Sequence, residues 1–98
     1  MGPTAYSLYI VRCADGSLYT GIATDVARRV QEHVGGSRGA KYLRGRGPVE
    51  LVFEQPVGDR GHATRLEYQV KRLDKAAKEA LIAGRCGLDD LVVSGVAG

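Results

Sequence analysis

The sequence predicts an α/β (α+β) fold in which a small three-stranded antiparallel sheet is flanked by helices, in the order strand–strand–helix–strand–helix–helix. Two segments near the N-terminus alternate side chains around a turn, as the strands of a hairpin do. Two later segments repeat apolar residues at helical spacing. The 98 residues have the length of one domain with a modest core. We expect that domain to span residues 1–83, and we assign no function to the tail at 84–98.

The predicted hairpin spans residues 6–22 and carries Tyr9 and Tyr19 on neighbouring strands. Its turn decides which faces they share, because a one-residue shift moves every side chain to the opposite face. A two-residue loop would put the tyrosines on opposite faces. A three-residue loop, with Gly16 in the left-handed bulge position, pairs Tyr9 with Gly21 and makes the tyrosines diagonal neighbours about 7 Å apart. We favour the three-residue loop. Ordinary strand tyrosines are the alternative to a catalytic pair.

Thr24-Asp25 can cap a helix that closes at Gly35. Its apolar stripe consists of Val26, Val30 and Val34. At the angular spacing of a helix, Arg28 points to solvent, whereas Arg29 and His33 share an edge that borders the buried face. Such an edge can project over the rim of a sheet and reach a phosphate. A solvated helix flank is the alternative.

Positive charge is concentrated in the first predicted helix and the segment that follows it. Between residues 28 and 47 there are six Lys and Arg against one acid, a net charge of +5. Residues 35–47 combine five glycines with four cations and one aromatic, and are predicted to form a mobile loop that contacts nucleic acid. The expected contact residues are Arg38, Lys41, Tyr42, Arg44 and Arg46. A solvated connector is the alternative.

A third strand is predicted from Val49, with Val49, Leu51 and Phe53 on one face and an end at Pro56. Helices are predicted at 59–73 and 75–83.

The second predicted helix carries its apolar stripe at Ala63, Leu66, Val70 and Leu73. Glu67 stands at an edge of that stripe, as Arg29 and His33 do on the first helix. An ordinary surface pair with Lys71, one turn later, is the alternative for this glutamate.

Taken in order, these residues resemble the GIY-YIG nuclease domain, in particular small stand-alone bacterial members and the structure-specific repair-nuclease branch. The resemblance covers residues 5–82. The family's two motifs correspond to Ser7-Leu8-Tyr9 and Tyr19-Thr20-Gly21, and three further family positions fall on Arg29, His33 and Glu67. The stretches SLYTGIATD, GAKYLRGRGPVELV and LEYQVKRL are typical of this branch. Two positions depart from the pattern: Ser7 replaces a glycine, and Ile22 stands where some members have a lysine.

The resemblance implies a metal-dependent endonuclease that hydrolyses DNA, with RNA as a further substrate class and a role in DNA repair or nucleic-acid processing. It implies that Glu67 holds one Mg²⁺ or Mn²⁺ and that Arg29 clamps the scissile phosphate. Tyr9, Tyr19 and His33 are the implied groups that position or deprotonate the attacking water. Sequence alone does not choose the base among these three.

Two other functions fit the same sequence: a nucleic-acid-binding module without turnover, and an interaction subunit. Many family members are targeted by an attached DNA-binding domain, for which we expect no room in 98 residues. We therefore expect structure-guided or weakly specific cleavage, or a targeting protein partner. With no apolar run of transmembrane length and no leader at the N-terminus, a cytoplasmic protein without membrane contact is expected. The two cysteines are too few for a metal knuckle.

Overall fold

The computed structural model describes residues 5–35 and 49–88, and for residues 33–35 it describes the backbone only. The elements are β1 (Tyr6–Cys13), β2 (Leu18–Ala23), α1 (Val26–Gly35), β3 (Val49–Gly58), α2 (Arg60–Lys71) and α3 (Lys75–Ile82). The predicted fold class and element order are confirmed. The five residues expected to contact nucleic acid in the basic loop, 38 to 46, lie outside the described residues.

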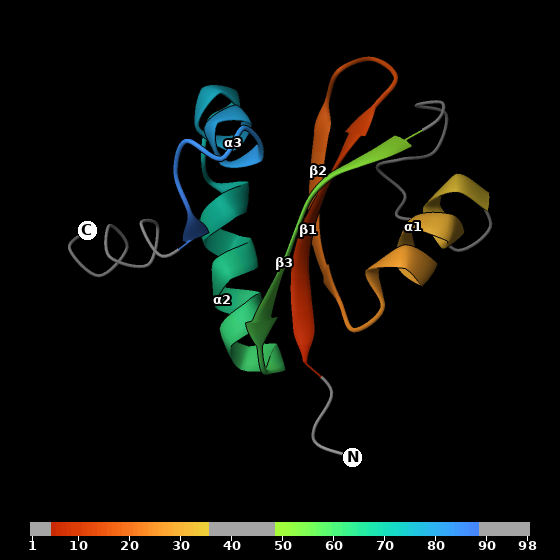
Figure 1. The fold of residues 1–98 in the computed structure, drawn as a ribbon, viewed down its shortest axis with the longest axis vertical. Coiled ribbons are helices and arrows are strands. Elements are labelled where there is room, and N and C mark those ends of the chain that lie inside the picture. The colour runs from red at the N-terminus through yellow and green to blue at the C-terminus, as the bar shows by residue number, and fades with distance from the viewer. Residues whose placement is uncertain (1–4, 36–48, 89–98) are drawn as a thin grey trace.

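The sheet is antiparallel with strand order β2-β1-β3, so β1 is the central strand. Figure 1 shows α1 on one face of the sheet and α2 with α3 on the other. Each face has its own core. Toward α2 and α3 the buried residues are Leu8, Ile10, Leu66, Val70, Leu81 and Leu88. Toward α1 they are Tyr9, Val11, Cys13 and Val26. The alternation predicted for β1 therefore holds.

The hairpin has the three-residue turn that we favoured. The amide of Cys13 donates to the carbonyl of Ser17 at 2.8 Å, and Gly16 has a φ of 89°. Only glycine adopts that conformation readily. Tyr9 pairs with Gly21, and Tyr9 and Tyr19 pack in the same core on the α1 side.

The prediction for the third strand is wrong in two respects. β3 continues through Pro56 to Gly58, which an edge strand tolerates because a missing N–H can face away from the sheet. Its side chains also change face. Ile10 pairs with Phe53 and Val11 with Leu51, so an extra residue, Val52, bulges out between them. As a result Val49 packs on the α1 side, whereas Phe53 packs on the α2 side.

The first and third helices begin after their predicted caps, whereas Asp59, predicted as the first residue of the second helix, is its N-cap, and that helix ends at Lys71 and not at residue 73. Asp25, Asp59 and Asp74 each accept a hydrogen bond from an amide three residues later, at 3.1, 2.8 and 2.8 Å. These bonds satisfy amides that have no partner inside the helix. Within the described part of the chain, no helix is long and apolar enough to cross a membrane.

The core extends past the third helix. Leu88 is 2% exposed and belongs to the cluster between the sheet and α2. Arg12 on β1 also forms two hydrogen bonds with Glu79 on α3, at 2.7 and 2.8 Å. Together these contacts fix α3 against the sheet.

Candidate active site

Tyr9 lies across the backbone of Gly21. A Cβ placed on Gly21 would come within 2.6 Å of the Tyr9 hydroxyl and 2.7 Å of the adjacent ring carbon. The phenol therefore extends from the central strand over β2, toward the edge of the sheet. Only the absence of a side chain at position 21 permits this approach.

Arg29 meets the end of the Tyr9 side chain. The guanidinium forms a side-chain hydrogen bond with the phenol, so α1 and β1 each supply one member of the pair. Arg29 also donates to Glu32 at 2.9 Å, and its side chain is 35% exposed. Arg28, by contrast, has a side chain that is 76% exposed. The predicted difference between the two adjacent arginines is confirmed.

The pKa of Tyr9 is raised from 10.0 to about 12, chiefly by burial and to a lesser extent by the nearby Tyr19 and Glu67, while Arg29 acts in the opposite direction. Burial dominates because the phenolate is the charged form and loses its hydration. Tyr9 therefore stays protonated at neutral pH. The hydrogen bond to Glu32 chiefly raises the pKa of Arg29, which keeps the guanidinium charged.

Glu67 approaches the tyrosines from the other face of the sheet. It stands on α2, which packs against β2 and β1, and its side chain is 21% exposed. Its charge acts on the Tyr9 phenol, so the two groups lie within electrostatic range. Because β2 is an edge strand, a side chain on α2 can reach a phenol that projects over that strand.

Lys71 connects Glu67 to Tyr19. Its ammonium lies 3.3 Å from a Glu67 carboxylate oxygen and 5.8 Å from the centroid of the Tyr19 ring. The surface pair considered as an alternative for Glu67 is therefore present, but it forms beside the tyrosines. The contact with Tyr19 has no signal in the sequence, because it depends on how α2 packs against β2.

The structure thus brings together Tyr9, Tyr19, Arg29 and Glu67. For His33 it gives only the backbone, in the last turn of α1, one turn beyond Arg29. Glu32 is a residue of the site that sequence reasoning missed. Its spacing from the two arginines, three and four residues, is the signal that could have found it, since such pairs are neighbours on a helix.

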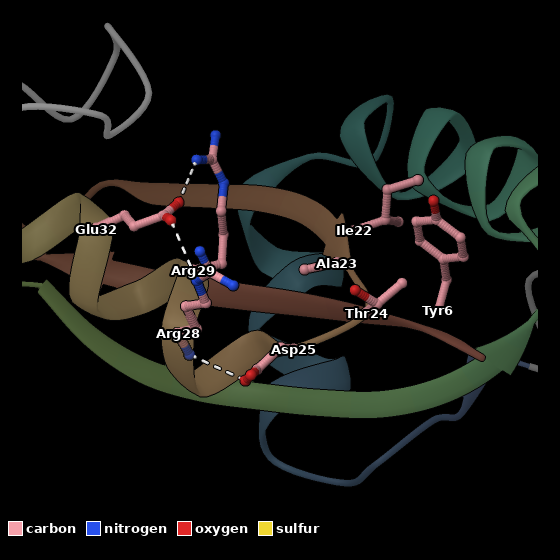
Figure 2. A pocket seen from close by; sticks show the side chains of 8 residues that line it. All are labelled: Tyr6, Ile22, Ala23, Thr24, Asp25, Arg28, Arg29 and Glu32. Atoms are coloured by element: carbon pink, nitrogen blue, oxygen red, sulfur yellow. Dashed lines mark hydrogen bonds and ion pairs between the residues drawn. The ribbon is translucent and has the colours of Figure 1, made fainter. Parts of the chain in front are cut away.

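Arg29 also lines a pocket of about 320 Å³ (Figure 2). Its lining comprises Tyr6, Ile22, Ala23, Thr24, Asp25, Arg28, Arg29 and Glu32. The lining contains two acids and two arginines, so its net charge is zero and it does not attract an anion. Tyr9, Tyr19 and Glu67 do not belong to it. We therefore centre the candidate site on the Tyr9–Arg29 contact and not on this pocket.

Comparison with known proteins agrees with this geometry. The sequence model described as the GIY-YIG catalytic domain matches residues 5–80. The chain belongs to the GIY-YIG family. This is a family of nuclease domains, and the matched range includes both residues of the Tyr9–Arg29 contact.

Relatives of this GIY-YIG chain match it along nearly its whole length. It is 54% identical over 91 residues to UPF0213 protein YhbQ of Escherichia coli K12, covering 93% of this chain and 90% of that protein. It is 51% identical over 92 residues to UPF0213 protein VC_A0739 of Vibrio cholerae, with the same coverage.

Two solved structures share the fold. The chain is 43% identical to UPF0213 protein BH0048 of Bacillus halodurans, with a TM-score of 0.53, covering 90% of this chain and 93% of that one. It is 34% identical to protein EF2693 of E. faecalis, with a TM-score of 0.59, covering 85% and 88%.

Proposed function

We propose that the protein is a metal-dependent endonuclease that hydrolyses DNA phosphodiester bonds in DNA repair or nucleic-acid processing. One observation carries the proposal: the buried Tyr9 phenol is hydrogen-bonded by Arg29 and lies in electrostatic range of Tyr19 and Glu67. Four different elements, β1, β2, α1 and α2, thus present polar groups to one point. An ordinary strand tyrosine does not need this arrangement.

The donor set near Tyr9 fits one Mg²⁺ or Mn²⁺. Glu67 offers a single, partly exposed carboxylate, and the described residues contain no group of three His, Cys, Asp or Glu that could form an all-protein cage. Mg²⁺ suits such a site, because it keeps several waters and binds through one or two carboxylates plus substrate phosphate. When bound, the ion supplies a Lewis acid that stabilises the leaving 3′-oxygen.

Arg29 is proposed to bind a non-bridging oxygen of the scissile phosphate. Its guanidinium is held between Glu32 and the Tyr9 phenol, so the fork is oriented before substrate arrives. The guanidinium can then stabilise the negative charge that develops on the phosphate as water attacks, without first changing its own orientation. Removing a donor of this kind costs about 10² to 10³ in rate in other enzymes.

Tyr9 is proposed to orient the attacking water and not to deprotonate it. With a pKa near 12 the phenol holds its proton, and Arg29 donates to its oxygen, so the O–H is directed elsewhere. His33 is the better base, because an unperturbed imidazole has a pKa of about 6.5. In the proposed step the water oxygen forms a bond to phosphorus and the water proton passes to His33. The bond to the 3′-oxygen breaks, and that oxygen takes a proton from solvent to become the 3′-hydroxyl.

The test is incubation with Mg²⁺ or Mn²⁺ and a panel of single-stranded, duplex, flapped and branched DNAs, with RNA counterparts. We expect cleavage of at least one DNA, leaving 5′-phosphate and 3′-hydroxyl ends, with a rate that rises with pH around 6.5. His33→Gln should remove that rise. Tight binding without any cleavage would contradict the proposal and favour a binding module. A rate that keeps rising far above neutral pH would assign the base to a tyrosine.

A further inference from the structure

The outward face of α2 carries a stripe of three exposed residues, Arg65, Tyr68 and Arg72, which we call the α2 stripe. Around the helix axis, Arg72 stands about 40° and Arg65 about 60° from Tyr68. The three side chains therefore share one face, opposite the buried residues Ala63, Leu66 and Val70. Packing of the core requires nothing of this face.

Tyr68 is 62% exposed, well above Leu51 at 37%, the other exposed large apolar residue among those the structure describes. The guanidinium of Arg72 lies 5.5 Å from its ring centroid. An aromatic ring with a cation beside it, open to solvent, is the arrangement that stacks on an unpaired base while the cation meets the backbone.

Charge along α2 agrees with a polyanionic ligand. The helix and its C-cap residue together carry four cations, at 60, 65, 71 and 72, and one acid, Glu67, a net charge of +3. β3 is the strand at the opposite edge of the sheet from β2, and it exposes the acids Glu50 and Glu54. A polyanion is therefore attracted to α2 and repelled from the β3 edge.

The α2 stripe is also continuous with the candidate active site. Viewed down the axis of α2, Lys71 lies between the directions of Glu67 and Tyr68. It contacts both Glu67 and Tyr19. A nucleic-acid strand that leaves the scissile phosphate on this side would pass Lys71 and reach Tyr68 within one turn of the helix.

From the stripe, its charge and its position we propose that α2 binds a single-stranded segment of the substrate beside the scissile phosphate. Tyr68 stacks on an unpaired base, and Arg65 and Arg72 contact phosphates. The inference rests on the proposed function and narrows it, because it assigns a preference for substrates that have a single strand next to the cleavage point.

Binding is measured by fluorescence anisotropy in EDTA, where no turnover occurs, with a labelled single-stranded oligonucleotide and with the corresponding duplex. Tyr68→Ala should weaken single-strand binding at least about fivefold, whereas Tyr68→Phe should keep it, since stacking needs the ring and not the hydroxyl. The loss should appear on DNA and RNA alike, because every base has a π-face. The variants should melt like the wild type, since Tyr68 is exposed.

The arginines are tested through the salt dependence of the same binding. Arg65→Gln and Arg72→Gln should each reduce the slope of log K against log salt by about 0.7, the value for one phosphate contact on a single strand. Arg85→Gln, an exposed arginine beyond α3, serves as the charge-matched control and should leave the slope unchanged.

Unchanged binding by Tyr68→Ala, or an equal effect of Arg85→Gln, would overturn the inference. The assay also separates the two proposals. If the wild type never cuts but the stripe variants lose binding, the α2 site is supported and the nuclease proposal is contradicted. If the wild type cuts and the stripe variants bind as it does, the nuclease proposal is supported and the α2 site is contradicted.

Discussion

The Tyr9 hydroxyl occupies the space that a side chain on Gly21 would need. The 2.6 Å separation between that oxygen and a Cβ built on Gly21 is shorter than real Cβ contacts. Tyr9 and Gly21 are directly paired across β1 and β2, and the phenol passes over the backbone of the glycine. Gly21 thus sets the position of the Tyr9 phenol.

Gly21→Ala should displace the Tyr9 phenol from Arg29. We expect a loss of about 1 to 3 kcal/mol in the free energy of unfolding, as for other insertions into packed sites, together with loss of nuclease activity. Gly61→Ala is the matched control, because its Cβ would meet nothing closer than 3.6 Å and α2 gains a better helix former. Urea unfolding of both variants checks this. A Gly21→Ala protein as stable and active as the wild type would contradict the assigned contact.

Stability should fall at high pH because of Tyr9. Below pH 10 the phenol is protonated in both the folded and unfolded chains. Between pH 10 and about 12 the unfolded chain loses the proton while the folded chain keeps it, since burial raises the pKa of Tyr9 to about 12. Two pH units correspond to about 2.7 kcal/mol.

Urea unfolding across that pH range measures the effect by comparison with Tyr9→Phe, which has no phenol to ionise. The variant should show a shallower decline than the wild type. Parallel declines in the two proteins would mean that the Tyr9 phenol ionises in the folded state as readily as in the unfolded chain.

Arg29→Lys should lower the cleavage rate by about 10² to 10³, although it keeps the charge, because an ammonium lacks the planar fork. Arg28→Lys is the control on the same helix. Its side chain is 76% exposed, so we expect a rate within about twofold of the wild type. Rates at saturating substrate separate this effect from binding. Equal losses in the two variants would show that only the charge of α1 matters.

Lys71→Met should tighten Mn²⁺ binding to the free protein. The ammonium lies 3.3 Å from a Glu67 oxygen and opposes a second cation there, and its side chain is 49% exposed. In a water-like dielectric the lost repulsion is about 1 kcal/mol, or about fivefold in affinity. Electron paramagnetic resonance of free Mn²⁺ reports the change without nucleic acid. Lys75→Met, on α3, should leave the affinity as it is, and an unchanged affinity in Lys71→Met would place the metal elsewhere.

Local rules were enough to predict most of the fold. Capping residues predicted the starts of the first and third helices, and the left-handed Gly16 predicted the register that joins Tyr9 to Gly21. The faces of the third strand could not be predicted in this way, because the bulge at Val52 is set by pairing with β1. Edge position, also a property of the whole sheet, is what lets Pro56 remain inside a strand.

The candidate site divides in the same way. Helix angles placed Arg29 and Glu67 at the borders of buried faces, and in the structure their side chains are partly exposed, 35% and 21%. The hydrogen bond between Tyr9 and Arg29 and the contact of Lys71 with Tyr19 could not be predicted, because each joins elements whose packing the sequence does not specify locally. The raised pKa of Tyr9 follows from that packing as well.

The central claim is that Glu67 holds the catalytic metal, and Glu67→Gln tests it most directly. The substitution keeps the size of the side chain and removes its charge. With the best-cleaved DNA from the panel and saturating Mg²⁺, we expect the wild type to cut and the variant to lose at least about 10² in rate while binding the DNA as tightly in EDTA. Cleavage by Glu67→Gln at the wild-type rate would contradict the account.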